Sequence, residues 1–125
     1  MILDTNALSA WADGEIQVEE LLKPGNTAYF PIIVIGEFQF GIKQSRKKKR
    51  YKEFLFSCLP KGAVVDLTLE TANNYSEIRL ELKRAGTPIP ANDIWIAAIA
   101  RQLNEPILTN DHHFDYVSNI KTVNF

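Results

Sequence analysis

The stretch from residue 90 to residue 110, PANDIWIAAIARQLNEPILTN, holds one long apolar segment, a short polar break and a second apolar run. The first segment predicts a helix over about residues 92–104 that is buried on almost every side. The second run predicts a short strand over residues 106–109. A buried helix that leads directly into a buried strand is typical of a layered α/β domain.

The same alternation of strand and helix patterns continues toward both ends of the chain. Thr68 is a good N-cap for one of the helices, and Gly86 suits the left-handed turn that would end it. The order of elements predicts the α/β class, with a central, mainly parallel sheet of about five strands and helices on both faces. Further strands are predicted at residues 1–3, 28–34, 63–67 and 121–125. Further helices are predicted at 7–22, with a break at Asp13 and Gly14, and at 35–45, 50–59 and 69–85.

Length and composition fit one globular domain over residues 1–125, with 46% hydrophobic and 23% charged residues. The single cysteine, Cys58, lies in an apolar run and is expected to be buried. It excludes an intramolecular disulfide and a cysteine-based zinc site. No signal peptide is visible, and no run approaches the ~18 apolar residues of a membrane span. We therefore expect a soluble cytoplasmic protein.

The net charge is −1, but the positive charges are concentrated in one place. Residues 43–52, KQSRKKKRYK, contain 7 of the 14 basic residues, and we call this stretch the basic segment. It can be a solvated helix face, or an edge that binds the phosphates of a nucleic acid. The candidate RNA-binding residues are Lys43, Arg46, Lys47, Lys48, Lys49 and Arg50.

Two carboxylates follow predicted strands directly. Asp4 comes after the strand at 1–3, and Asp111 comes just after the strand at 106–109. Ligands of open parallel sheets bind at the carboxyl ends of the strands, so both residues are expected at the binding edge. Each alone is also explained as a turn or cap residue.

Two further carboxylates lie in apolar surroundings. Glu37 is flanked by Ile, Val and Phe residues and should be partly buried, so it needs a proton or a cation. Asp93 opens the buried helix of residues 92–104, where a helix cap explains it locally. Capping and metal ligation are compatible, because each uses one carboxylate oxygen.

The four carboxylates would repel one another at one edge of a sheet unless a divalent cation were present. Oxygen ligands suit Mg²⁺ or Mn²⁺ rather than zinc. Such a cation polarises a phosphoryl oxygen and activates water for attack on phosphorus. The pattern therefore indicates metal-dependent phosphodiester chemistry, with the basic segment available for flanking phosphates.

Four motifs in order give the chain a resemblance that covers nearly its whole length. The sequence resembles the PIN-domain ribonucleases, specifically the VapC-type toxins of bacterial toxin–antitoxin systems. The first motif is ILDTN at residues 2–6, and the second acid is Glu37 on the helix after the second strand. The third and fourth motifs are IPANDIWIAAIA at residues 89–100 and ILTNDHHF at residues 107–114.

The resemblance implies an endoribonuclease that depends on Mg²⁺ or Mn²⁺ and leaves 5′-phosphate and 3′-hydroxyl ends. It also implies a homodimer and a cognate antitoxin that inserts a segment into the acidic groove. On this interpretation Asp4 and Asp93 bind the metal directly, and Glu37 and Asp111 complete the catalytic set. The residues expected to orient carboxylates or water are Thr5, Asn6 and Thr109.

Several alternatives stay open at this point. The site can hold one ion or two, and Asp115 can replace Asp111 as the fourth acid. The chain can also be a catalytically inactive PIN-fold module that binds RNA or protein. A haloacid-dehalogenase-like phosphatase would carry Asp where this chain has Asn6. His112 and His113 are interpreted as solvated loop residues.

Overall fold

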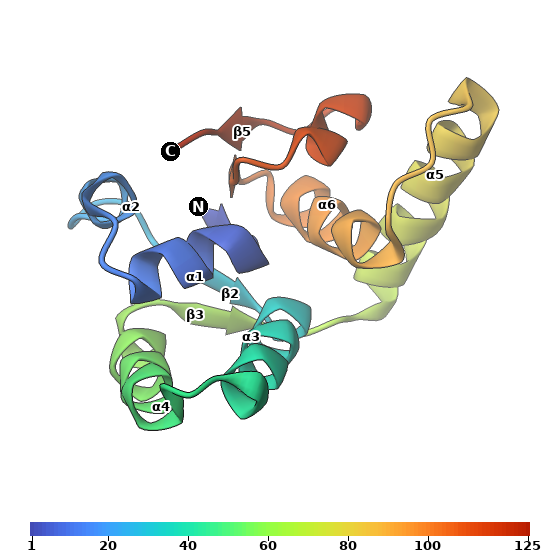
Figure 1. The fold of residues 1–125 in the computed structure, drawn as a ribbon. Coiled ribbons are helices and arrows are strands. Elements are labelled where there is room, and N and C mark those ends of the chain that lie inside the picture. Colours follow the sequence, from blue (N-terminus) through green and yellow to red (C-terminus); the bar gives the residue numbers. More distant parts are fainter.

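The computed structural model describes residues 1–125, and its centre is a five-stranded sheet (Figure 1). The strand order is β3-β2-β1-β4-β5, and every neighbouring pair is parallel. The fold class predicted from the sequence is thereby confirmed. The strands are β1 (Ile2–Leu3), β2 (Tyr29–Pro31), β3 (Ala63–Val65), β4 (Ile107–Leu108) and β5 (Thr122–Val123).

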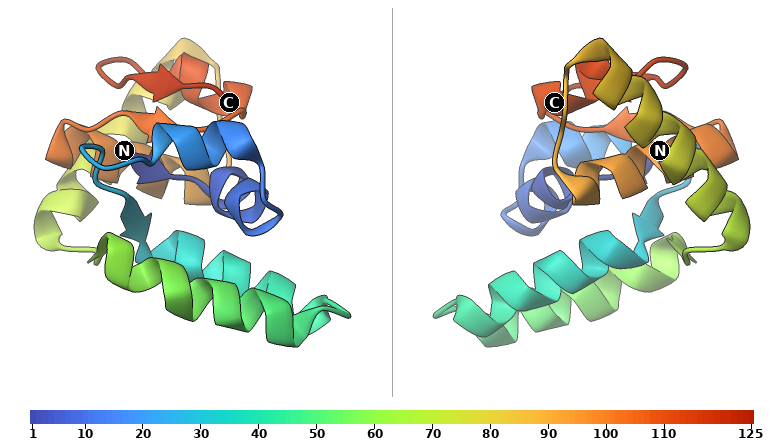
Figure 2. Two further views of the ribbon diagram at one scale, coloured as in Figure 1. Left: turned by 90° about the vertical axis from the view of Figure 1, so that its left-hand side faces the viewer. Right: turned by 90° about the vertical axis from the view of Figure 1, so that its right-hand side faces the viewer.

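Helices connect the strands and cover the sheet from two sides. The helices are α1 (Thr5–Ala12), α2 (Ile16–Leu21), α3 (Ile32–Gln44), α4 (Lys48–Cys58), α5 (Leu69–Ala85) and α6 (Ala91–Leu103), with short 3₁₀ turns η1 (Leu59–Lys61) and η2 (His112–Tyr116). The chain passes outward from β1 to β3 and then returns through α5 and α6 to β4. Because crossovers between parallel strands are right-handed, this reversal places α5 and α6 opposite α1 and α2 (Figure 2).

Local sequence signals set the ends of α5 as expected. The Thr68 hydroxyl accepts a bond from the Thr71 backbone N–H, and the Thr71 hydroxyl accepts one from the Thr68 N–H. This reciprocal pair satisfies two of the free donors at the helix start. Gly86 ends the helix with φ of 71°, a conformation that glycine adopts without strain.

The core is built on the two central strands. Ile2, Leu3, Ile107 and Leu108 are fully buried, because both faces of the sheet are covered. Helix α6 packs against them with an almost continuous apolar surface, as its sequence predicts. Cys58 is buried too, and burial raises the pKa of its thiol to about 11.

The edge strand β3 depends on a glycine that precedes it. A Cβ atom at Gly62 would lie 2.2 Å from the backbone oxygen of Ala28, so no other residue fits there without a shift. This close approach lets β3 pair with β2 along its whole length. None of the helices combines the length and the hydrophobicity that a membrane span requires.

Helices α3 and α4 lie side by side as a hairpin that projects away from the sheet (Figure 2). The loop between them, at residues 45–47, lies at the far end of this hairpin. The helix predicted at residues 50–59 begins earlier, at Lys48, so much of the basic segment is helical. The fold therefore displays the basic segment at a protruding tip.

Candidate functional site

The four acids singled out from the sequence reach one pocket at the carboxyl edge of the sheet. Asp4 follows β1, and Asp111 follows β4 after two residues, while Glu37 comes from α3 and Asp93 from the first turn of α6. The pocket has a volume of about 160 Å³. Its lining consists of these four acids with Thr5, Asn6 and Ile96. We call it the acidic pocket.

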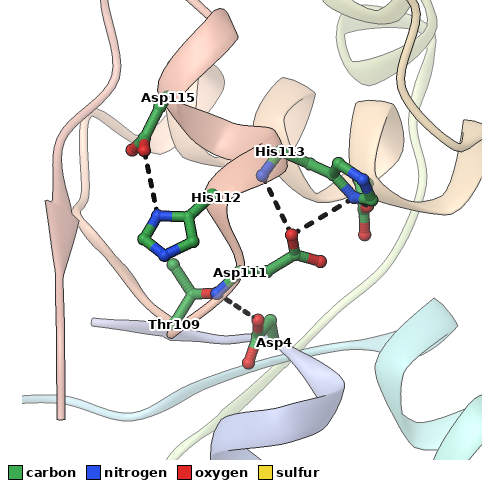
Figure 3. A network of polar contacts seen from close by, with 7 residues as sticks. Asp4, Thr109, Asp111, His112, His113 and Asp115 are labelled. Carbon is green, nitrogen blue, oxygen red and sulfur yellow. Dashed lines mark hydrogen bonds and ion pairs between the residues drawn. The ribbon is translucent and has the colours of Figure 1, made fainter.

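Asp4 is the most deeply buried of the acids, with 4% of its surface exposed. It caps α1, because one carboxylate oxygen accepts the backbone N–H of Ala7 at 2.7 Å. The other oxygen accepts the hydroxyl of Thr109 (Figure 3). Burial raises the pKa of Asp4, the bonds from Thr109 and Ala7 oppose the rise, and the charges of Asp111 and Asp93 add to it.

Thr109 joins two acids of the pocket. Its hydroxyl donates to Asp4 and accepts the backbone N–H of Asp111 at 2.8 Å. The residue is itself buried, so its side chain has little freedom to turn away. The contact fits the orienting role expected for Thr109, and it fixes the position of the fourth acid relative to the first.

Asp93 is not the cap of α6, and the local interpretation drawn from its sequence is wrong. The N-cap position belongs to Pro90, with no capping bond from a side chain. Asp93 stands in the first helical turn, where a negative charge is favoured by the helix dipole. Burial raises the pKa of Asp93, and its hydrogen bond to His113 counteracts that rise. The carboxylate is thus directed toward the pocket.

His113 lies between two of the acids. Its Nδ1 atom is 2.9 Å from Oδ2 of Asp93 and 3.2 Å from Oδ1 of Asp111. The hydrogen bond to Asp93 raises the pKa of His113, and the negative charges of Asp111 and Asp93 raise it further. Partial removal of the imidazole from water acts in the opposite direction. The expectation of a purely solvated loop residue is therefore wrong for His113.

His112 and Asp115 form a separate pair outside the acidic pocket. Nδ1 of His112 is 3.2 Å from Oδ2 of Asp115, and the imidazole is 91% exposed (Figure 3). Here the expectation of a solvated histidine is correct. Asp111, and not Asp115, lines the pocket.

Glu37 is partly buried, as its apolar surroundings predict. Its nearest polar partner is Asn92, whose side-chain amide donates to Oε1 at 3.3 Å. Sequence reasoning did not single out Asn92, although it stands next to Asp93. Its signal is weak, because a polar residue at a helix start is common.

Donor atoms in the pocket and beside it fit a divalent cation, although His113 is not among the residues that line the pocket. Asp93, Asp111 and His113 each offer one ligand atom, and these three atoms lie within 4.8 Å of one another. Asp4 is outside this close group but lines the same pocket. Mutual repulsion contributes to the raised pKa values of Asp4 and Asp93, and a bound cation would reverse that effect.

A second pocket, of about 320 Å³, lies between α1, α3 and α4. Thr5 and Glu37 line this pocket as well as the acidic pocket. Ser45 and Tyr51, both within the basic segment, also line it. The two pockets therefore share a wall, and the second one reaches Ser45 in the loop at the hairpin tip. The six basic residues singled out there are all exposed: Lys43, Arg46, Lys47, Lys48, Lys49 and Arg50.

Comparison with known proteins gives the family. A sequence model of the PIN domain matches residues 1–120. The chain belongs to the PIN-domain family. This PIN domain is 32% identical over 114 residues to the ribonuclease VapC2 of Rickettsia felis. The aligned region covers 88% of this chain and 85% of the relative.

Solved structures agree with this assignment. The PIN domain matches the structure of VapBC2 from Rickettsia felis bound to a DNA fragment from their promoter, with a TM-score of 0.88 and 28% identity. The match covers 99% of this chain and 97% of that chain. VapBC from Salmonella typhimurium, solved bound to DNA, shares the fold with a TM-score of 0.87 at 24% identity, over 98% and 96% of the two chains.

Proposed function

We propose that this protein is an endoribonuclease toxin that hydrolyses RNA phosphodiester bonds with the help of Mg²⁺ or Mn²⁺. It leaves 5′-phosphate and 3′-hydroxyl ends. The observation that carries the proposal is the meeting of Asp4, Glu37, Asp93 and Asp111 in one pocket at the carboxyl edge of the sheet. The similarity to a VapC ribonuclease supports the choice of RNA as substrate.

Each acid has a proposed task. Asp4 and Asp93 would bind an ion directly, while Glu37 and Asp111 would act through metal-bound water or through a second ion. When bound, the ion stabilises charge on the phosphoryl group and lowers the pKa of water. Thr109 positions Asp4 and Asp111 through the two hydrogen bonds of its hydroxyl. The remaining polar residues of the pocket, Thr5 and Asn6, orient carboxylates or water.

The RNA chain is proposed to run from the acidic pocket to the basic segment. The pocket that contains Thr5, Glu37, Ser45 and Tyr51 provides the connection. Positive side chains at the hairpin tip would neutralise flanking phosphates, which the carboxylates would otherwise repel. This arrangement separates the place of cleavage from the place of electrostatic attachment.

A cognate antitoxin and a second copy of the chain are the proposed protein partners. The solved structures that this chain resembles are of VapBC proteins, and one of them is described as a member of the VapBC family of toxin–antitoxin systems, which supports an antitoxin. An antitoxin segment in the acidic groove would exclude RNA from the carboxylates. Light scattering of the protein with and without its antitoxin would measure both associations.

The decisive experiment is cleavage of a pool of structured RNAs by wild type and Asp93→Asn, with Mg²⁺ and with EDTA. We expect cleavage only by wild type with the metal, with 5′-phosphate at the new ends. Equal cleavage by the two proteins would remove Asp93 from the mechanism. A folded wild type that binds RNA but never cuts it would favour the alternative of an inactive binding module.

A further inference from the structure

The two histidines of this chain are neighbours in sequence but have different surroundings. His112 faces solvent beside Asp115, whereas the His113 side chain is 46% exposed and contacts two acids of the acidic pocket. The difference is visible in Figure 3, where the two rings point to different carboxylates. Asp93 and Asp111 could bind a cation without an imidazole nearby. The position of His113 between them therefore needs its own explanation.

The backbone fixes His113 at this position. Oδ1 of Asp111 accepts the backbone N–H of His113 at 2.9 Å and caps the turn η2. The backbone N–H of Asp111 is in turn bonded to Thr109. Phe114, which follows directly, is buried in the core and anchors the turn. The residues before and after His113 are thus both fixed, and they hold its imidazole beside Asp93 and Asp111.

The donor set decides which cations this arrangement suits. Mg²⁺ takes oxygen ligands almost exclusively and keeps much of its water. An imidazole nitrogen is a good ligand for first-row transition metals, whose affinities rise along the series that begins at Mn²⁺. Two carboxylates and one imidazole, with ligand atoms within 4.8 Å of one another, therefore match Mn²⁺ better than Mg²⁺.

We propose that His113 is a nitrogen ligand of a divalent ion that Asp93 and Asp111 share, and that it makes this position selective for Mn²⁺ over Mg²⁺. The inference rests on the proposed metal-dependent function and adds a preference between the two ions. A histidine that only orients the carboxylates by hydrogen bonds would influence both ions alike. A nitrogen ligand influences Mn²⁺ far more than Mg²⁺.

The first test is pulsed electron paramagnetic resonance of untagged protein loaded with Mn²⁺, since a directly bound imidazole nitrogen modulates the spin echo. The chain has only two histidines, so modulation of the imidazole type in His112→Leu can come only from His113. We expect nitrogen modulation in wild type and in His112→Leu, and its loss in His113→Leu. Absence of modulation in His112→Leu overturns the proposal, even if His113→Leu does not fold.

The second test is calorimetric titration with MnCl₂ and with MgCl₂ at about pH 8, above the ordinary imidazole pKa of about 6.5. For His113→Leu we expect Mn²⁺ affinity to fall about tenfold or more, as it does when the immediate surroundings of a bound metal are altered, with a much smaller change for Mg²⁺. His112→Leu should match wild type. Equal reductions for both ions, or a wild type that binds no Mn²⁺, contradict the proposal.

The proposed ribonuclease function and the proposed role of His113 as a ligand can be rejected separately. Nitrogen modulation without any RNA cleavage would uphold His113 as a ligand and reject the ribonuclease. Metal-dependent cleavage without nitrogen modulation would uphold the ribonuclease and reject His113 as a ligand.

Discussion

The acidic pocket and the basic segment are both charged, but they are built in opposite ways. The carboxylates come from four separate elements of the chain, are buried or half-buried, and each has a hydrogen-bond partner. The basic side chains come from one continuous stretch and are exposed at a hairpin tip (Figure 2). A site assembled in the first way depends on individual positions. A surface assembled in the second way depends on total charge and is screened by salt.

Among changes that keep all four carboxylates, the largest effect is expected from Thr109→Val, because one hydroxyl serves two acids. The change leaves Oδ2 of Asp4 without its donor and leaves the Asp111 N–H without its acceptor. We expect metal affinity and RNA cleavage to fall about 10–100-fold, with a decrease of about 1–3 kcal/mol in unfolding free energy. Calorimetry, cleavage rates and denaturant unfolding would measure these effects.

The matched control is Thr109→Ser, which keeps the hydroxyl and removes only a methyl group. It should retain most of the metal affinity and the cleavage rate. If Thr109→Val behaves like Thr109→Ser in these two assays, Thr109 has no positioning role in the pocket.

A smaller and graded effect is expected from the basic segment. Alanine at Arg46, Lys47, Lys48 and Lys49 should weaken RNA binding at low salt. The slope of log K against log salt concentration should become less steep by up to ~0.7 for each phosphate that is no longer neutralised. Fluorescence anisotropy at several salt concentrations would measure the slope. An equal change of charge elsewhere provides the control: alanine at Lys61, Lys83, Arg84 and Lys121, all exposed. An identical slope in the two variants would leave the basic segment as a solvated helix face.

The smallest effect concerns the pH dependence of stability without metal. The pKa of His113 is raised from 6.5, mainly by its bond to Asp93, so the imidazolium stabilises the folded state. This contribution is complete below pH 6.5 and is lost as the pH rises through the raised pKa. In EDTA, the melting temperature of wild type should therefore decline over this range relative to His113→Asn. His112→Asn should follow wild type, and parallel curves for wild type and His113→Asn would refute the effect.

The contrast between the two regions also explains what the sequence could predict. The alternation of apolar runs predicts the parallel sheet, because burial on both faces leaves a local pattern. Asp4 and Asp111 were expected at the binding edge because each follows an apolar strand. The ends of α5 follow from Thr68 and Gly86, which act within one helical turn. Local chemistry therefore gives the elements and the side of the sheet that carries the site.

Contacts between distant segments could not be predicted in the same way. His113 meets Asp93 across 20 residues, and Asn92 meets Glu37 across 55, only because η2 and α3 pack near the start of α6. The error at Asp93 has a local cause. Pro90, with φ of −56° and ψ of 144°, takes the N-cap position and starts the helix earlier, so Asp93 falls inside the first turn. Its side chain is then free for the pocket.

The central claim is that the acids of this pocket hold a divalent ion, and titration of Mg²⁺ into wild type and Asp93→Asn tests it most directly. Calorimetry should show one or more binding events in wild type. In Asp93→Asn the affinity should be reduced about tenfold or more, since a carboxylate that faces the ion is removed. Equal Mg²⁺ affinity in the two folded proteins would contradict the account, and the acidic pocket would then require another explanation.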